Sequence, residues 1–263
     1  MRTSKIIILA LLFINSSNLW AHTPYLQPTS FEVNRSGKIS LDASFAEKFF
    51  IPEVAFNNSI FLVTSPKGKQ TNPEFVSQLS VRTVAEHTLK DDGTYRFSTG
   101  SRLGKIFKVY EQDGERHSAK DPKQPIPKGA KLLSFFQSNT KAETFVTKGK
   151  PNKTALQATN QGLELVMESH PNELFVDDEV HLKALFNGKV VPDLKLDIML
   201  AKYQFSTDKP TQMITSDNQG EFNFKVKEQG VYLLRTRHRT PAPKGSIAPT
   251  ISNTYTLTLE IIE

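Results

Sequence analysis

The sequence predicts an all-β protein made of two β-sandwich modules, of which the C-terminal one is immunoglobulin-like. From Phe31 onward, short runs alternate apolar and polar residues and are broken by Gly, Pro, Asn and Asp, which is typical of half-buried strands. After residue 162 such runs recur with a turn signal roughly every 8–12 residues, as in an immunoglobulin-like sandwich. A polar stretch rich in Gly, Pro and Asn, residues 148–153, separates the two halves. We therefore expect modules over residues 22–157 and 158–263.

The strands expected in the N-terminal module are short. They span residues 38–45, 59–64, 81–89, 94–99, 104–112 and 144–147. Residues 131–137 fit either a short helix or a strand. Pro122, Pro125 and Pro127 exclude a helix interior or central strand, so the segment 121–129 is expected to be an extended loop.

The C-terminal module shows the same alternation with stronger turn signals. The strands expected there span residues 162–168, 179–186, 194–203, 211–215, 221–226, 231–238 and 254–262. Asn187-Gly188 predicts a tight hairpin after the second of these strands. Residues 211–215 and 221–226 are expected to form a second hairpin across the turn at 217–220.

The first 21 residues have the features of a secretory signal peptide. A positive start, Met1 to Lys5, precedes the apolar run Ile6 to Ile14, and Ala21 offers a small residue for cleavage. The run is too short to anchor the chain in a membrane. We therefore expect a periplasmic or secreted protein without a membrane anchor.

Composition narrows the possible chemistry. The formal charge is +6, of which Arg2 and Lys5 belong to the expected signal peptide, and the remaining basic residues are interspersed with acids. This pattern argues against nucleic acid as a partner. The absence of cysteine excludes disulfides, thiolate metal sites and cysteine nucleophiles. Ser98 and Ser101 lack the setting of a nucleophile elbow, and Arg102 and Lys105 make only a weak candidate for an anion-binding turn. No catalytic residue is predicted.

Cleavage after Ala21 would make His22 the first residue. Its α-amine and imidazole can then chelate one metal ion, and nitrogen ligands suit nickel, cobalt, copper or zinc. Pro24 has no amide hydrogen, so the backbone cannot wrap the metal through that position, and further ligands must come from elsewhere. His87 and His117 are the candidates for a second metal ligand, because they lie at the ends of strand-like runs in the same module as His22. Spacing alone favours the alternative, in which His22 is simply the residue that follows the signal peptide.

Other polar residues are weaker candidates. We expect His170 in a loop, His181 on a solvated sheet face and His238 among arginines. The acids Asp42, Glu47 and Glu53 fit either carboxylate ligands or solvated strand ends.

The chain also resembles a known family in six stretches. These are Ala21–Pro28, Gly93–Gly100, the pair Gly162–Leu165 and His170–Asn172, Phe186–Pro192, and Ser216–Gly220. They resemble an exported family of domains of unknown function that is often labelled a periplasmic component of nickel or cobalt uptake. The resemblance implies two all-β modules, a histidine at the mature N-terminus and a divalent metal partner. Among the site residues only His22 carries over, since the second histidine that many relatives have beside the opening motif is missing here.

Three functions remain open. The first is a non-enzymatic, periplasmic metal-binding accessory protein that serves nickel or cobalt uptake. In it His22 is the chelating anchor, His87 or His117 is the second ligand, and a membrane transporter is the partner. The second is an exported binding or structural module for an envelope, peptide or saccharide partner, contacted through Tyr25, Tyr110 and Tyr203. The third is a copper oxidase, which requires a second imidazole at His22. We rank them in that order.

Overall fold

The computed structural model describes residues 22–34, 36–205 and 212–263, so the predicted signal peptide lies outside the described residues. Within these ranges the chain is all β, as predicted: it contains no α-helix, only the short 3₁₀ helices η1 (Thr154–Leu156) and η2 (Ala201–Tyr203). No helix in the described part of the chain is long and apolar enough to cross a membrane.

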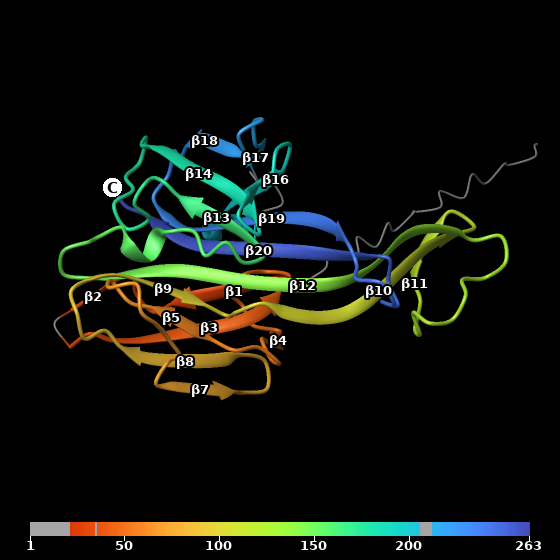
Figure 1. Ribbon diagram of the computed structural model, residues 1–263, viewed down its shortest axis with the longest axis horizontal. Helices are drawn as coiled ribbons and strands as arrows, with labels where there is room; N and C mark the ends of the chain where they lie inside the picture. Colours follow the sequence, from red (N-terminus) through yellow and green to blue (C-terminus); the bar gives the residue numbers. More distant parts are fainter. Residues whose placement is uncertain (1–21, 35, 206–211) are drawn as a thin grey trace, which may run out of the picture.

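A large central sheet runs through the whole molecule (Figure 1). Its main path joins β17 (Gln212–Thr215), β16 (Lys195–Leu200), β19 (Gly230–Pro241), β20 (Thr250–Ile261), β12 (Lys131–Lys148), β9 (Gly93–Ser98), β5 (Leu62–Thr64) and β6 (Gln70–Thr71). Beside β12 also lie β2 (Glu32–Val33) and β10 (Arg102–Gln112), which pairs with β11 (Glu115–Ser118). β12 and β20 are parallel neighbours, so one sheet contains strands from both predicted modules.

Two smaller sheets cover opposite faces of the central sheet, one below and one above it in Figure 1. The N-sheet contains β1 (Thr23–Pro28), β3 (Lys38–Ala46), β8 (Thr83–Thr88), β7 (Phe75–Gln78) and, paired with β3, β4 (Val54–Ala55). The C-sheet contains β13 (Leu163–Met167), β14 (Glu179–Phe186), β15 (Lys189–Val190) and β18 (Glu221–Lys225). The predicted module boundary at residue 157 is not tested by this arrangement and stays a prediction.

Strand β12 contributes to two separate hydrophobic cores. Successive side chains of a strand point to opposite faces of its sheet. Phe145 therefore packs in the core under the C-sheet, with Leu182 and Leu257, whereas its neighbour Val146 packs in the core under the N-sheet, with Leu41. Both cores consequently depend on the same central strand.

The predicted strands are largely confirmed, with two differences in how they connect. The Asn187-Gly188 hairpin forms as expected, with Phe186 opposite Lys189. Residues 131–148 form one long strand rather than a short element followed by a separate one.

The second predicted hairpin is wrong. β17 pairs with β16 in the central sheet, whereas β18 pairs with β14 in the C-sheet. The turn at 217–220 therefore carries the chain from one sheet to the facing one. A turn signal specifies that the chain reverses direction, and it does not specify which partner each strand then takes.

Candidate functional site

His22 directly precedes β1, and its exposed imidazole contacts a carboxylate there. Nε2 of His22 is 2.9 Å from Oε2 of Glu53. The second oxygen of that carboxylate, Oε1, accepts a hydrogen bond of 2.9 Å from the backbone N–H of Glu47. Oε1 of Glu53 is thus held by the backbone of Glu47, while Oε2 faces the imidazole of His22.

The local fold explains this meeting. Thr23 lies opposite Ala46, so His22 is at the end of β3. The chain then turns back and β4 pairs with the end of β3, with Val54 opposite Phe45, which returns Glu53 to the same edge. Two acids flagged in the sequence, Glu47 and Glu53, are therefore at this place, although only the side chain of Glu53 is seen to contact His22 in the described part of the chain.

A distant arginine fixes the first residue of β1. Arg235 donates a hydrogen bond of 2.8 Å to the hydroxyl of Thr23. The same guanidinium donates two bonds, of 3.0 and 2.7 Å, to Oδ2 of Asp197. The residue that follows His22 is therefore tied to the central sheet.

The structure does not bring His87 to His22. His87 lies opposite Ile39, seven residues along β3 from Ala46, so about 23 Å separates the two positions at the usual rise per residue. Its half-buried ring packs beside the rings of Tyr95 and Phe97. Burial lowers the pKa of His87, which favours the neutral ring.

His117 is equally remote. It lies opposite Tyr110 and stacks on that ring, with 5.4 Å between the ring centroids. Tyr110 is eight residues along β10 from Arg102, whose guanidinium lies over the ring of Phe45 near the His22 end of β3. Eight residues of strand correspond to about 26 Å. The three histidines predicted as ligands thus occupy three separate places.

The remaining histidines have other neighbours. His170 is a loop residue, as expected, but it is buried and its Nε2 is 3.0 Å from the hydroxyl of Thr94. His181 contacts Asn223, and the ring of His238 lies against Phe186. Across residues 22–34, 36–205 and 212–263, no three His, Asp or Glu side chains are grouped as a metal site would require. A metal at His22 would therefore need the α-amine as one of its ligands.

One expected contact for a partner is wrong. Tyr25 is fully buried, because its ring packs edge-on against Phe50 in the small cluster between β1 and β19. Tyr203 is half-buried and donates its hydroxyl hydrogen to Glu228. Of the three tyrosines proposed as contacts, Tyr25 is unavailable to a partner.

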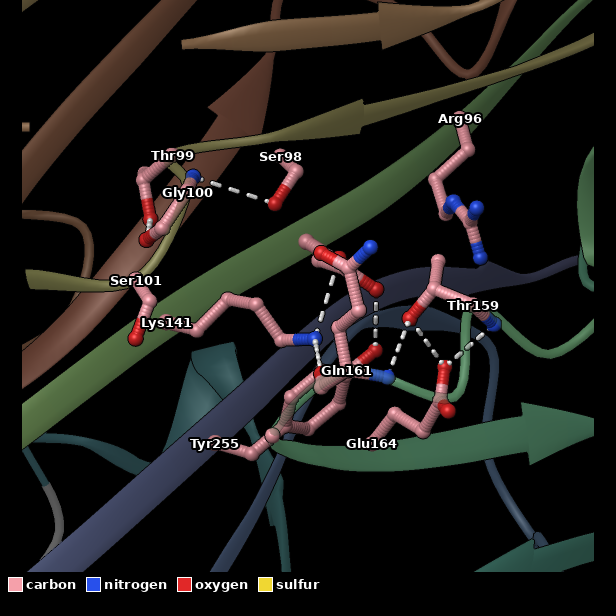
Figure 2. Close-up of polar contacts among 12 residues, drawn as sticks. Arg96, Ser98, Thr99, Gly100, Ser101, Lys141, Thr159, Gln161, Glu164 and Tyr255 are labelled. Atoms are coloured by element: carbon pink, nitrogen blue, oxygen red, sulfur yellow. Dashed lines mark hydrogen bonds and ion pairs between the residues drawn. The ribbon is translucent and has the colours of Figure 1, made fainter. Parts of the chain in front are cut away.

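A second candidate site was missed in the sequence. A polar pocket of about 140 Å³ opens over β5, β9 and β12, on the face of the central sheet opposite the N-sheet. The segment 159–163, which enters the C-sheet, forms its other wall. Arg96, Lys141, Gln161, Ser98 and Ser101 all line this pocket, and in Figure 2 Gln161 lies between Lys141 and Arg96.

A buried carboxylate organises the floor of this pocket. Glu143 accepts a hydrogen bond of 2.7 Å from the hydroxyl of Tyr255, and Nζ of Lys141 lies 3.6 Å from its other oxygen. Burial raises the pKa of Glu143, but Lys141, Arg96 and hydrogen bonds from Tyr255 and Ser98 outweigh burial and hold the pKa below its usual value. Burial and the negative neighbour Glu143 raise the pKa of Tyr255 well above its ordinary value. At neutral pH the pair is therefore a carboxylate and a neutral phenol.

Two cations converge on the same pocket from different strands. Arg96 on β9 is 8% exposed and donates one hydrogen bond, of 3.1 Å, to the carbonyl of Gln157. Lys141 on β12 has a side chain that is 13% exposed, and its hydrogen-bond acceptor is the carbonyl of Gln161 at 3.4 Å. In the sequence the only signal is charged residues at alternate strand positions, which is also the pattern of a solvated face.

The chain is thus an all-β protein of stacked sheets with two polar sites, one at the start of β1 and one over the middle of the central sheet. It belongs to the family described as domain of unknown function DUF4198, whose model matches residues 19–240. No curated protein matches the chain.

Solved structures resemble the chain only weakly. The Yersinia pseudotuberculosis adhesin InvE is 10% identical with a TM-score of 0.24, and the match covers 91% of this chain and 60% of the adhesin chain. Murine CEACAM1b is 10% identical with a TM-score of 0.20, over 91% of this chain and 100% of the other. The N-terminal domains of the bacteriophage RB49 capsid protein Hoc are 8% identical with a TM-score of 0.21, over 92% and 100%.

Proposed function

We propose that this is an exported, periplasmic or secreted protein that binds a divalent transition metal through His22 once the chain has been cut after Ala21. The observation that carries the proposal is the 2.9 Å contact between Nε2 of His22 and Glu53. A histidine that ligates a metal commonly donates its other ring N–H to a carboxylate, which fixes the tautomer and the ring orientation. Glu53 is in place to do so.

The donor set fits a chelate. With the proton of the ring on Nε2, toward Glu53, the lone pair of Nδ1 is free. Nδ1 and the α-amine of the same residue can then close a ring on one metal ion, and nitrogen donors suit nickel, cobalt, copper or zinc. Glu53 is therefore a positioning residue in this proposal, and the bond from Glu47 N–H keeps its carboxylate turned toward the imidazole.

Nickel or cobalt uptake, with a membrane transporter as the partner that receives the metal, is part of the proposal. It rests on the motif resemblance described above. His87 and His117 are not needed for the chelate. Any further ligand is expected from water or from the partner.

The test uses two purified forms of the chain. One begins at His22, and the other carries a single additional alanine before it, which moves the α-amine away from the imidazole. Calorimetric titration with Ni²⁺, Co²⁺, Cu²⁺ and Zn²⁺ should show binding by the first form and a loss of at least tenfold in affinity for the second. Equal affinities would rule out the N-terminal chelate. Variants His87→Ala and His117→Ala are matched controls that should bind as the parent does.

We also propose that the C-terminal module is immunoglobulin-like. Two observations support it. The order β13-β14-β18 faces the order β17-β16-β19-β20, which is the arrangement of strands A, B and E against C′, C, F and G. Tyr232, at the start of β19, donates its hydroxyl hydrogen to the carbonyl of Glu228 at 2.8 Å, as the tyrosine corner of such domains does.

A further inference from the structure

The polar pocket contains more hydrogen-bond donors than the described residues satisfy. A guanidinium has five N–H donors and an ammonium has three. Arg96 donates one hydrogen bond within the described part of the chain, and the contacts of Lys141 there are 3.4 Å to a carbonyl and 3.6 Å to a carboxylate. Both cations are largely removed from bulk water. Their nitrogens are not among the enclosed polar atoms without a partner, so the remaining donors face the open pocket, where water or a ligand can accept from them.

The carboxylates at and beside the pocket, in contrast, already have hydrogen-bond or ion-pair partners. Oε2 of Glu143 receives the hydroxyl of Tyr255, and its other oxygen faces Lys141. The nearby carboxylate of Glu164 receives two bonds from Thr159, one from its hydroxyl and one from its N–H (Figure 2), and a third from the N–H of Asn160. Among the charged residues that line the pocket, the two cations Arg96 and Lys141 face the single carboxylate of Glu143, so one positive charge is left in excess.

We propose that this pocket binds a small molecule with an oxyanion group, a carboxylate or a phosphate, held between Arg96 and Lys141. A planar guanidinium and an ammonium are the side chains that recognise such groups. Ser98, Ser101 and Gln161 line the same pocket and supply neutral polar groups for the remainder of the molecule.

The size of the pocket limits the ligand. A cavity of about 140 Å³ holds roughly ten water-sized positions. This suits a small organic acid or free phosphate. Strands β5, β9 and β12 and the segment leading into the C-sheet all contribute to the walls, so the bound molecule would contact both halves of the chain.

The site is independent of the metal proposal. His22 directly precedes β1 in the N-sheet, whereas the pocket is on the opposite face of the central sheet. The variant His22→Ala should therefore bind the small acid as the parent does, which separates the two proposals experimentally.

The experiment is a titration of the purified chain, in the His22→Ala background, with four probes. These are succinate, L-malate, inorganic phosphate and the neutral polyol erythritol. We expect at least one of the three anions to bind with a dissociation constant of about 1 mM or lower. The affinity should weaken as salt is added, and erythritol should not bind. The amide signals of Gly100 and Gly162, which line the pocket, should shift in the nuclear magnetic resonance spectrum. Comparing the affinities for succinate and L-malate with the affinity for phosphate shows whether the pocket prefers a carboxylate or a phosphate.

Two variants and one control decide the location. Lys141→Gln removes one cation and should weaken binding by about 10- to 100-fold. Ser101→Tyr keeps both cations and places a bulky side chain at the exposed edge of the pocket, so it should also abolish binding. This variant decides the location if Lys141→Gln fails to fold. Lys131→Gln, an exposed position on the same strand, is the control. The proposal is overturned if no anion binds up to about 20 mM, or if folded Lys141→Gln and Ser101→Tyr bind as the parent does.

Discussion

The hydroxyl of Thr23 accepts a hydrogen bond of 2.8 Å from Arg235, although 212 residues separate them in sequence. Arg235 is itself held by Asp197, so the start of β1 is attached to a pre-arranged guanidinium. His22 is the residue next to this attachment. The position of the proposed metal anchor therefore depends on strands β16 and β19, which come from the other half of the chain.

Removing the hydrogen bond between Thr23 and Arg235 should lower the stability of the protein slightly. We expect Thr23→Val to lower the free energy of unfolding by about 1 kcal/mol, since one partly buried hydrogen bond to a charged donor is lost while Arg235 keeps Asp197. Urea denaturation measures this. An unchanged midpoint would mean that the bond contributes nothing. Thr71→Val, an exposed threonine on β6, is the control.

Glu53→Gln should reduce metal affinity without unfolding the chain. The amide still fits the space, but it no longer attracts the ring proton to Nε2 as a carboxylate does. The affinity of the form that begins at His22 should fall by about 10- to 100-fold. Glu47→Gln is the matched control, because Glu47 contributes its backbone N–H to the contact. If both variants bind metal equally well, Glu53 has no part in the site.

The buried His170 makes stability depend on pH. Burial lowers the pKa of His170 from the ordinary 6.5, although the backbone of Asn152 and the charge of Glu173 oppose the shift and Lys153 adds to it. The unfolded chain therefore binds more protons. The stabilisation is complete above the unfolded pKa of about 6.5 and is lost as the pH falls toward the folded pKa.

Denaturation at pH 7.5, 6.0 and 5.0 should accordingly show falling stability, and His170→Gln should reduce that slope. His87 and His238, whose pKa values burial also lowers, contribute in the same direction, so part of the slope should remain. The exposed position His181→Gln is the control. A slope that is identical in the parent and in His170→Gln would contradict the prediction.

The hydrogen bond from Tyr232 to the carbonyl of Glu228 should contribute about 1 kcal/mol to the free energy of unfolding. Tyr232→Phe removes the 2.8 Å bond to the carbonyl of Glu228 while the ring stays in the core. Tyr110→Phe, on the arm formed by β10 and β11, should have little effect. Thermal unfolding of both variants gives the comparison, and equal melting temperatures would show that the corner contributes no stability.

Phe145 and Val146 should report on the coupling of the two cores. Phe145→Ala leaves a cavity under the C-sheet and should cost about 3–5 kcal/mol. Because β12 serves both cores, we expect hydrogen exchange to quicken in β3 as well as in β14. Val146→Ala, on the opposite face, should do the same from the other core. Independent modules would instead show faster exchange only on the mutated side.

The sequence predicted those features that depend on local pattern. The alternation over residues 38–45 and 179–186 corresponds to β3 and β14, and the turn at Asn187-Gly188 corresponds to the hairpin of β14 with β15. The length of β12 was missed because the five consecutive polar residues 137–141 interrupt its alternation of apolar and polar residues. The partner of β18 was wrong because it depends on which sheet a strand joins, and that is a long-range choice.

The sites were predicted in the same partial way. His22 was singled out by its covalent chemistry, and Glu53 was among the acids considered, but their contact depends on β4 folding back onto β3. The pocket around Arg96 could not be predicted, because one of its walls comes from the remote segment 159–163. Charges on a strand look solvated until the layer that covers them is known.

The parallel pairing of β12 with β20 also means that β12 is synthesised well before the strand that it pairs with. β12 ends at Lys148 and β20 begins at Thr250, so at about 5–20 residues per second the ribosome needs roughly 5–20 s to supply the partner. During that interval β20 is not yet available to form backbone hydrogen bonds with the edge of β12 that it will later cover. An open edge invites pairing with other chains. A holding chaperone that covers newly made chain should therefore raise the yield of this protein, and more so the more slowly it is translated.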